Sequence, residues 1–229
     1  MTRRILAWCV HLYTATGLLL AAAMTVLIIK GGDLNYRLAM LLMVIATIID
    51  STDGALARLA DVKKWAARVD GRILDDITDF HTYTSVPLLL IWQSGLLTWP
   101  SSIALLVALL ASAYGFSQSQ AKTSDGFFLG FPSYWNALVF YLYFGHPSEQ
   151  AVTFWVLLFA FLTFVPVKYL YPTAGGPLRR TTILLALIWG IMLGLVLTGS
   201  VKNEQLWVWM SLAFPIYYFT VSWWVTLRS

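Results

Sequence analysis

The sequence predicts an all-α protein that is embedded in a membrane and crosses it with about eight helices. Hydrophobic residues make up 59% of the 229 residues and charged residues only 11%, whereas soluble domains carry roughly 25% charged residues. Apolar segments follow one another along the whole chain, and basic residues gather at their ends. A soluble fold of this size could not keep so much apolar surface from water, so the composition indicates a polytopic membrane helix bundle.

The apolar segments define the predicted spans. A transmembrane helix needs about 20 mostly apolar residues. The stretches between the candidate segments are too short for a soluble domain, so we expect residues 1–229 to form a single membrane domain. The predicted spans are 5–29, 38–52, 72–98, 101–118, 127–144, 150–171, 181–199 and 204–227.

Three of these spans are irregular. The basic start of the chain resembles a signal peptide, but the apolar run from Ile5 to Ile29 is too long for one, so we expect it to remain as the first helix. The second span is short and continues into acidic residues. Gly130 and Pro132 interrupt the start of the fifth span, where Pro132 suits a first helical turn.

The distribution of Lys and Arg predicts the orientation, because cytoplasmic loops of membrane proteins are enriched in both. With eight spans and a cytoplasmic N-terminus, both termini are cytoplasmic and only three basic residues lie outside, namely Lys30, Arg37 and Lys202. The twelve on the inside are Arg3, Arg4, Arg58, Lys63, Lys64, Arg68, Arg72, Lys122, Lys168, Arg179, Arg180 and Arg228. Because these residues mark span ends and form no single basic face, the net charge of +4 does not indicate nucleic-acid binding.

Seven of the eleven acidic residues lie between Asp50 and Asp79. Asp50 and Asp53 end the second predicted span, and Asp75 and Asp79 begin the third. Residues three or four positions apart share one face of a helix. Each of the two helices therefore offers a pair of carboxylates at its cytoplasmic end.

Carboxylates at membrane depth are energetically costly and indicate a functional site. Pairing with basic residues of the connecting loop is the preferred interpretation for Asp61 and Asp70. It does not account for the two facing pairs, which would repel one another unless a cation lay between them. Mg²⁺ or Mn²⁺ would remove the repulsion, and two such ions could bridge a diphosphate. The expected metal ligands are Asp50, Asp53, Asp75 and Asp79.

Small residues between the carboxylate pairs would let a nucleotide lie against the backbone. They are Gly54, Ala57 and Gly71, although close helix packing favours the same residue types. Arg58 could hold a phosphate oxygen through its planar guanidinium. An ion pair of Arg58 within the loop is an equally good interpretation.

The spacing Asp50-x-x-Asp53-Gly54-x-x-Ala57-Arg58, twelve residues, then Gly71-x-x-x-Asp75-x-x-x-Asp79 resembles the signature of the CDP-alcohol phosphotransferases. Every position of that signature is filled. The twelve-residue gap is longer than is usual in the family and looks like that of the bacterial phosphatidylcholine synthases. Three further stretches are similar to that branch, namely 11–15, 130–136 and 167–172.

The resemblance implies transfer of a phosphatidyl group from CDP-diacylglycerol to choline, with release of CMP and a requirement for Mn²⁺ or Mg²⁺. It also implies a bacterial inner-membrane enzyme with Asp79 as base for the acceptor hydroxyl. The count of basic residues predicts that its site faces the cytoplasm. CDP-diacylglycerol, choline and membrane lipids are the expected partners, and a homodimer stays open. The expected CDP-binding residues are Asp53, Gly54, Ala57, Arg58, Gly71 and Asp75.

The choline site has to be inferred from the residues themselves. A trimethylammonium group has no N–H to donate, and aromatic faces are its natural partners. Tyr83 is expected on the face of Asp75 and Asp79, one turn deeper, with its ring rather than its hydroxyl against choline. Tyr134 and Trp135 are weaker candidates, because membrane interfaces are rich in Tyr and Trp in any case.

Other polar residues near the spans are expected to have more ordinary roles. Asp76 lies about 100° round the helix from Asp75 and is expected to pair with Arg72 or another cation. His81 is off the aspartate face and is expected to be structural. Four cations at helix ends could hold lipid phosphates, although snorkelling is the preferred interpretation. They are Lys122, Lys168, Arg179 and Arg180.

Three alternative functions fit the sequence less well. A family member that uses serine, glycerol phosphate or inositol phosphate would need cations beside Asp79 for an anionic acceptor, and Lys122, at a helix end, is the only candidate. The motif Asp75-Asp76-x-x-Asp79 also resembles a prenyltransferase diphosphate site, but no second acidic motif follows it. A transporter would need acidic residues near mid-bilayer and paired broken helices, which the sequence lacks.

Overall fold

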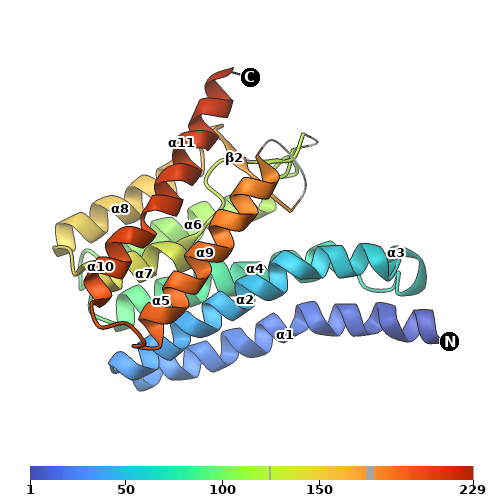
Figure 1. Cartoon of the computed structure of the whole chain (residues 1–229), viewed down its shortest axis with the longest axis horizontal. Helices are drawn as coiled ribbons and strands as arrows, with labels where there is room; N and C mark the ends of the chain where they lie inside the picture. The colour runs from blue at the N-terminus through green and yellow to red at the C-terminus, as the bar shows by residue number, and fades with distance from the viewer. Residues whose placement is uncertain (124, 174–177, 229) are drawn as a thin grey trace.

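Helices dominate the computed structural model, which describes residues 1–123, 125–173 and 178–228 (Figure 1). In chain order the elements are α1 (Thr2–Lys30), α2 (Asp33–Leu59), α3 (Val62–Trp65), α4 (Gly71–Asp79), the π-helix η1 (Phe80–Ser85), α5 (Val86–Gln93), α6 (Ile103–Ser117), β1 (Phe127–Leu129), α7 (Trp135–Gly145), α8 (Glu149–Leu162), β2 (Lys168–Leu170), α9 (Arg179–Leu197), α10 (Glu204–Ser211) and α11 (Ala213–Arg228).

Three helices are long and apolar enough to cross a membrane, namely α1, α2 and α9. The shorter helices α6 and α8 are apolar as well. Large apolar side chains such as Leu19, Leu110 and Ile191 are exposed on these helices. An exposed apolar helix surface suits lipid, and a helix satisfies its own backbone hydrogen bonds there. The chain is thus a helical membrane protein with several apolar helices, as the sequence predicts.

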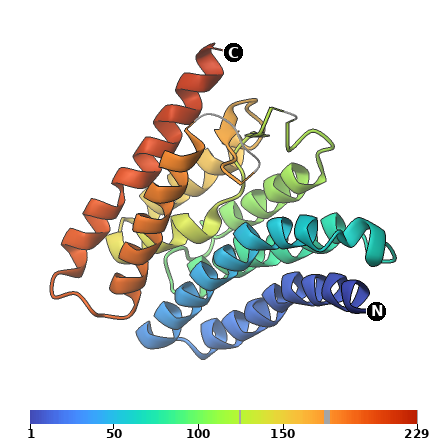
Figure 2. The ribbon, with the colours of Figure 1, turned by 45° about the vertical axis from the view of Figure 1, so that its right-hand side comes forward.

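α1 and α2 form a long antiparallel pair that lies along one edge of the molecule (Figures 1 and 2). Gly31 and Gly32 connect them with φ angles of 70° and 87°, values that favour glycine over residues with a side chain. α2 runs well beyond the predicted span 38–52. Acidic residues lower the hydropathy of a segment without stopping its helix, so the apolar run underestimated the length of α2.

The third predicted span, 72–98, is helical but not uniform. It comprises α4, the π-helix η1 and α5, which ends at Gln93. A π-turn holds more residues than an α-turn and therefore changes the direction of the side chains that follow it. This change begins directly after Asp79, beside the acidic residues.

The predicted spans 127–144 and 150–171 are wrong in extent. Residues at the start of one and the end of the other form the antiparallel strands β1 and β2, and Phe127 pairs with Leu170. α7 begins only at Trp135, so Pro132 is not in its first turn. Apolar content does not separate a buried strand from a helix. Gly130, with φ 83°, packs where a Cβ would collide with the Thr163 carbonyl.

The last predicted span, 204–227, is divided into α10 and α11 at Leu212. Pro215 lies at the start of α11, where its missing N–H cannot bond to the preceding turn, and this interrupts a continuous helix. α11 lies beside α9 in Figure 2. The largest buried side chains, among them Trp135, Phe140 and Tyr169, fill the centre of the molecule.

Candidate metal centre and its surroundings

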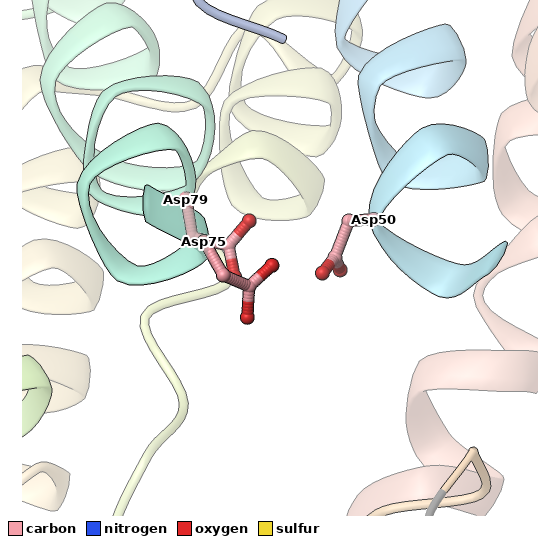
Figure 3. Close-up of side chains that lie close together, drawn as sticks. All are labelled: Asp50, Asp75 and Asp79. Atoms are coloured by element: carbon pink, nitrogen blue, oxygen red, sulfur yellow. The ribbon is translucent and has the colours of Figure 1, made fainter. Parts of the chain in front are cut away.

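Three carboxylates from two helices converge. Asp50 projects from α2 toward Asp75 and Asp79 of α4 (Figure 3), and each offers an oxygen within 4.8 Å of the others. The N-cap of α4 sets the start of this helix, since Asp70 Oδ1 accepts hydrogen bonds from the backbone N–H of Arg72 at 2.9 Å and of Ile73 at 3.4 Å. From that start, Asp75 and Asp79 fall on one face, as their spacing predicts.

The fourth predicted ligand, Asp53, lies close by but outside this group of three. Its side chain is buried, and its Oδ2 accepts a hydrogen bond from the Thr14 hydroxyl at 2.7 Å. All four aspartates line one small cavity together with residues of α1, α2, α4 and η1. These further lining residues are Thr14, Gly17, Ala46, Ile49, Thr78 and Thr82.

Tyr83 reaches the same group of carboxylates by its hydroxyl. The buried Tyr83 donates a hydrogen bond of 2.7 Å to Asp50 Oδ2. The sequence predicts that Tyr83 lies near the site but assigns a role to its ring alone. The hydrogen bond was missed because helical spacing relates Tyr83 to residues of its own helix and says nothing about α2.

The two other aromatic candidates have different surroundings. The Tyr134 ring centroid lies 6.1 Å from that of Tyr83 and 5.9 Å from that of Tyr218. Trp135 is fully buried, and its Nε1–H donates to Ser112 Oγ at 2.7 Å, toward α6. The structure therefore brings Tyr134 to Tyr83, turns Trp135 toward Ser112, and adds Tyr218, which no sequence signal distinguishes from the other tyrosines.

The small residues of the motif fall into two environments. A Cβ on Gly71 would lie 3.2 Å from Cε1 of the buried His11, so Gly71 permits close packing of α4 on α1. Gly54 is exposed on α2, and the nearest atom to a Cβ there would be the Arg58 guanidinium at 3.6 Å. Arg58 and Ala57 follow on the next turn of the same helix. Gly54 therefore leaves open space on α2, whereas Gly71 does not.

The loop acids differ from one another. Asp76 pairs with Arg72 at 3.5 Å, which confirms the expectation for Asp76. Asp70 caps α4, and Asp61 occupies a left-handed backbone conformation with φ 49°. In the described part of the chain neither Asp61 nor Asp70 forms an ion pair within 4.0 Å, so the expectation of loop ion pairs for these two was wrong.

The four candidate cations for lipid phosphates have different surroundings. Lys122 Nζ lies 3.7 Å from Asp75 Oδ2, at the acidic site. Lys168 pairs with Asp125 at 3.0 Å, and hydrogen bonds from Thr123 and Lys168 lower the pKa of the Asp125 carboxyl below its usual value. Two further cations are exposed at the start of α9, namely Arg179 and Arg180. His81 is exposed and contacts only the edge of Phe80 among described rings.

The group of three carboxylates has the chemistry of a divalent metal site. All of its donors are oxygen atoms, which are the ligands that Mg²⁺ and Mn²⁺ prefer. Asp50, Asp75 and Asp79 could hold such an ion, and Asp53 borders the same cavity. The fold and this site define a helical membrane protein with a candidate metal centre between two of its helices.

Comparison with known proteins shows the family. No family model matches the chain. A phosphatidylcholine synthase of Legionella pneumophila is 37% identical over 229 residues, which cover 96% of this chain and 88% of that protein. The phosphatidylcholine synthase of Borreliella burgdorferi is 38% identical over 80% of this chain and 78% of its own, and that of Pseudomonas aeruginosa is 30% identical over 97% and 93%.

The chain belongs to the bacterial phosphatidylcholine synthases, a branch of the CDP-alcohol phosphotransferases. This membership confirms the resemblance of the Asp50–Asp79 motif. It also rules against the prenyltransferase and transporter alternatives.

Proposed function

We propose that the chain transfers the phosphatidyl group of CDP-diacylglycerol to choline and releases CMP in a metal-dependent reaction. The observation that carries this proposal is the convergence of Asp50, Asp75 and Asp79 within 4.8 Å. The names of the relatives supply the product class. Two divalent ions, Mg²⁺ or Mn²⁺, fit these carboxylates together with Asp53, and when bound they would neutralise charge on the diphosphate.

Asp79 is proposed as the base. The choline hydroxyl is weakly acidic, so its proton must be taken up as its oxygen attacks the phosphorus of the phosphatidyl group. The new P–O bond forms to choline, the P–O bond to CMP breaks, and the proton passes to the Asp79 carboxylate. Asp79 suits this role because it lies one helical turn beyond Asp75, farther from the start of α4.

The remaining substrate contacts are proposals on the same basis. Tyr83 and Tyr134, whose rings lie 6.1 Å apart, would offer aromatic faces to the trimethylammonium group, with Trp135 as a third candidate. The CDP moiety would lie along the motif, where Gly54 leaves open space. Its proposed contacts are Asp53, Gly54, Ala57, Arg58, Gly71 and Asp75. Lipid phosphates would be bound by Lys122, Lys168, Arg179 and Arg180.

Release of CMP by the purified protein tests this proposal. With CDP-diacylglycerol and a panel of choline, serine, glycerol phosphate and inositol phosphate, we expect CMP release with choline alone. Removal of divalent ions by a chelator should abolish it. Single Asp→Asn changes at Asp50, Asp75 and Asp79 should each lower kcat by at least about 100-fold, because each removes a negative ligand. Full activity after chelation, or a preference for an anionic acceptor, would contradict the proposal.

A further inference from the structure

Lys122 lies on the segment that follows α6, where contacts with the β1–β2 region fix its backbone. It forms a β-bridge with Phe128, and the ring centroid of Phe128 lies 4.2 Å from that of Tyr171. The Lys122 ammonium lies 5.9 Å from the centroid of the same Tyr171 ring. The side chain thus starts from the small β1–β2 sheet and reaches across to α4.

The ammonium group faces the carboxylates of the candidate metal centre. Lys122 Nζ is 3.7 Å from Asp75 Oδ2 and 3.9 Å from Asp76 Oδ1, and 41% of its side chain remains exposed. Arg72, the other cation at Asp76, is 71% exposed and belongs to α4 itself. Among the ion pairs within 4.0 Å in the described ranges, only that of Lys122 with Asp75 includes one of the three converging carboxylates.

We propose that Lys122 is an exchangeable counter-ion, which balances the carboxylates while metal is absent and passes to the substrate diphosphate once metal is bound. The proposal rests on the proposed function. Two divalent ions would neutralise the four aspartates and would remove the attraction that holds the ammonium group there. A diphosphate is doubly negative at that point, and an ammonium on a flexible stem can follow it.

This role also accounts for a cation beside the site of an enzyme whose proposed acceptor is itself a cation. A lysine 3.7 Å from Asp75 would suit an anionic acceptor if it served the acceptor. In the proposed role Lys122 binds the phosphates of CDP-diacylglycerol and makes no contact with the acceptor. Metal would therefore bind before CDP-diacylglycerol, because metal frees Lys122 for the diphosphate.

Titration of the substrate-free protein with Mn²⁺, followed by the EPR signal of free Mn²⁺, tests the exchange. Lys122→Met keeps most of the apolar stem and removes the charge, so it should tighten Mn²⁺ binding by roughly three- to tenfold at pH 8. Lys122→Arg retains the charge and should stay within about twofold of the unchanged protein. Lys64→Met is the control, because it removes an equal charge at a different place. Lys64 lies on α3, with its ammonium over the Trp65 ring.

The second half of the exchange is measured with substrates. Lys122→Met should raise the KM for CDP-diacylglycerol about tenfold and leave the KM for choline unchanged. If Lys122→Met left Mn²⁺ binding unchanged or weakened it, the proposal would be overturned. A lower melting temperature in the same variant would then make Lys122 an anchor of the β1–β2 sheet. Lys122→Gln provides the same comparison if Lys122→Met does not fold. Failure of the unchanged protein to bind Mn²⁺ would instead overturn the metal centre and the proposed function with it.

Discussion

Two hydroxyl groups orient the carboxylates of the acidic site. Tyr83 donates to Asp50 at 2.7 Å, and Thr14 donates to Asp53 at 2.7 Å. Hydrogen bonds to charged groups in partly buried sites are stronger than those between neutral groups. Residues that hold metal ligands in this way affect metal affinity without touching the ion.

Tyr83→Phe is expected to weaken Mn²⁺ binding by about 10- to 100-fold, because Asp50 loses its donor while the aromatic ring remains. The KM for choline should change little if the ring binds choline. Tyr83→Ala should weaken Mn²⁺ binding similarly and also raise that KM by up to about tenfold.

The control is Tyr141→Phe. The Tyr141 hydroxyl contacts Ser211 at 3.1 Å and Trp189 at 2.7 Å, in the packing of α7. Wild-type Mn²⁺ affinity in Tyr83→Phe would show that the hydrogen bond does not position Asp50.

Thr14→Val is expected to lower kcat and the melting temperature, because a buried carboxylate loses its hydrogen bond in a change that keeps the side-chain shape. The loss should be about 1.5–3 kcal/mol in the free energy of unfolding. Thr25→Val, on the same helix, removes only a bond to the Ala21 carbonyl and should have a smaller effect on both quantities. Equal effects of the two changes would argue against a special role for Thr14.

At the scale of elements, the site depends on the contact between α1 and α4. Gly17 lies against Thr78, and a Cβ on Gly17 would collide with the Thr78 Cγ2 methyl. Thr14 and Gly17 line the same cavity as the aspartates. The distance at which α1 packs on α4 therefore sets one wall of this cavity.

Gly17→Ala is expected to move α1 from α4 and to lower both activity and thermal stability, by about 1–3 kcal/mol in unfolding free energy. Adding Thr78→Ser removes the colliding methyl and keeps a hydroxyl that can still bond to the Leu74 carbonyl. The double variant should therefore recover most of the loss. Gly190→Ala on α9, where no heavy atom lies within 4 Å, is the control and should be nearly neutral.

At the scale of the whole molecule, the structure is that of a helical membrane protein. Its orientation in the membrane is a proposal that rests on the distribution of basic residues. Basic residues gather at one set of helix ends, which predicts a site that faces the cytoplasm. Lys63 on α3 and Lys202 between α9 and α10 are both exposed. The prediction places Lys63 on the cytoplasmic side of the membrane and Lys202 on the outer side.

Single cysteines at these two positions test it in intact cells, after Cys9 is replaced by serine. A membrane-impermeant thiol reagent should label Lys202→Cys from outside and should label Lys63→Cys only after the membrane is opened. The reverse pattern would place the acidic site on the outer face. Labelling of both from outside would contradict the number of spans between them.

The sequence by itself determined the membrane class, the family motif and the pairing of Asp75 with Asp79. Composition determines whether a chain is stable in water or in a membrane. Spacing along one helix determines which residues share a face of that helix. These are local properties. They also located Tyr83 near the site, because it follows Asp79 by one turn.

Only the tertiary structure decided which carboxylates converge, where the hydroxyl of Tyr83 points, and where Lys122 lies. The Asp50–Tyr83 and Thr14–Asp53 bonds join residues 33 and 39 positions apart, and their geometry depends on how three helices rotate and pack. The β1–β2 sheet was missed for the same reason, since a strand is stabilised by a distant partner while its apolar residues also suit a helix.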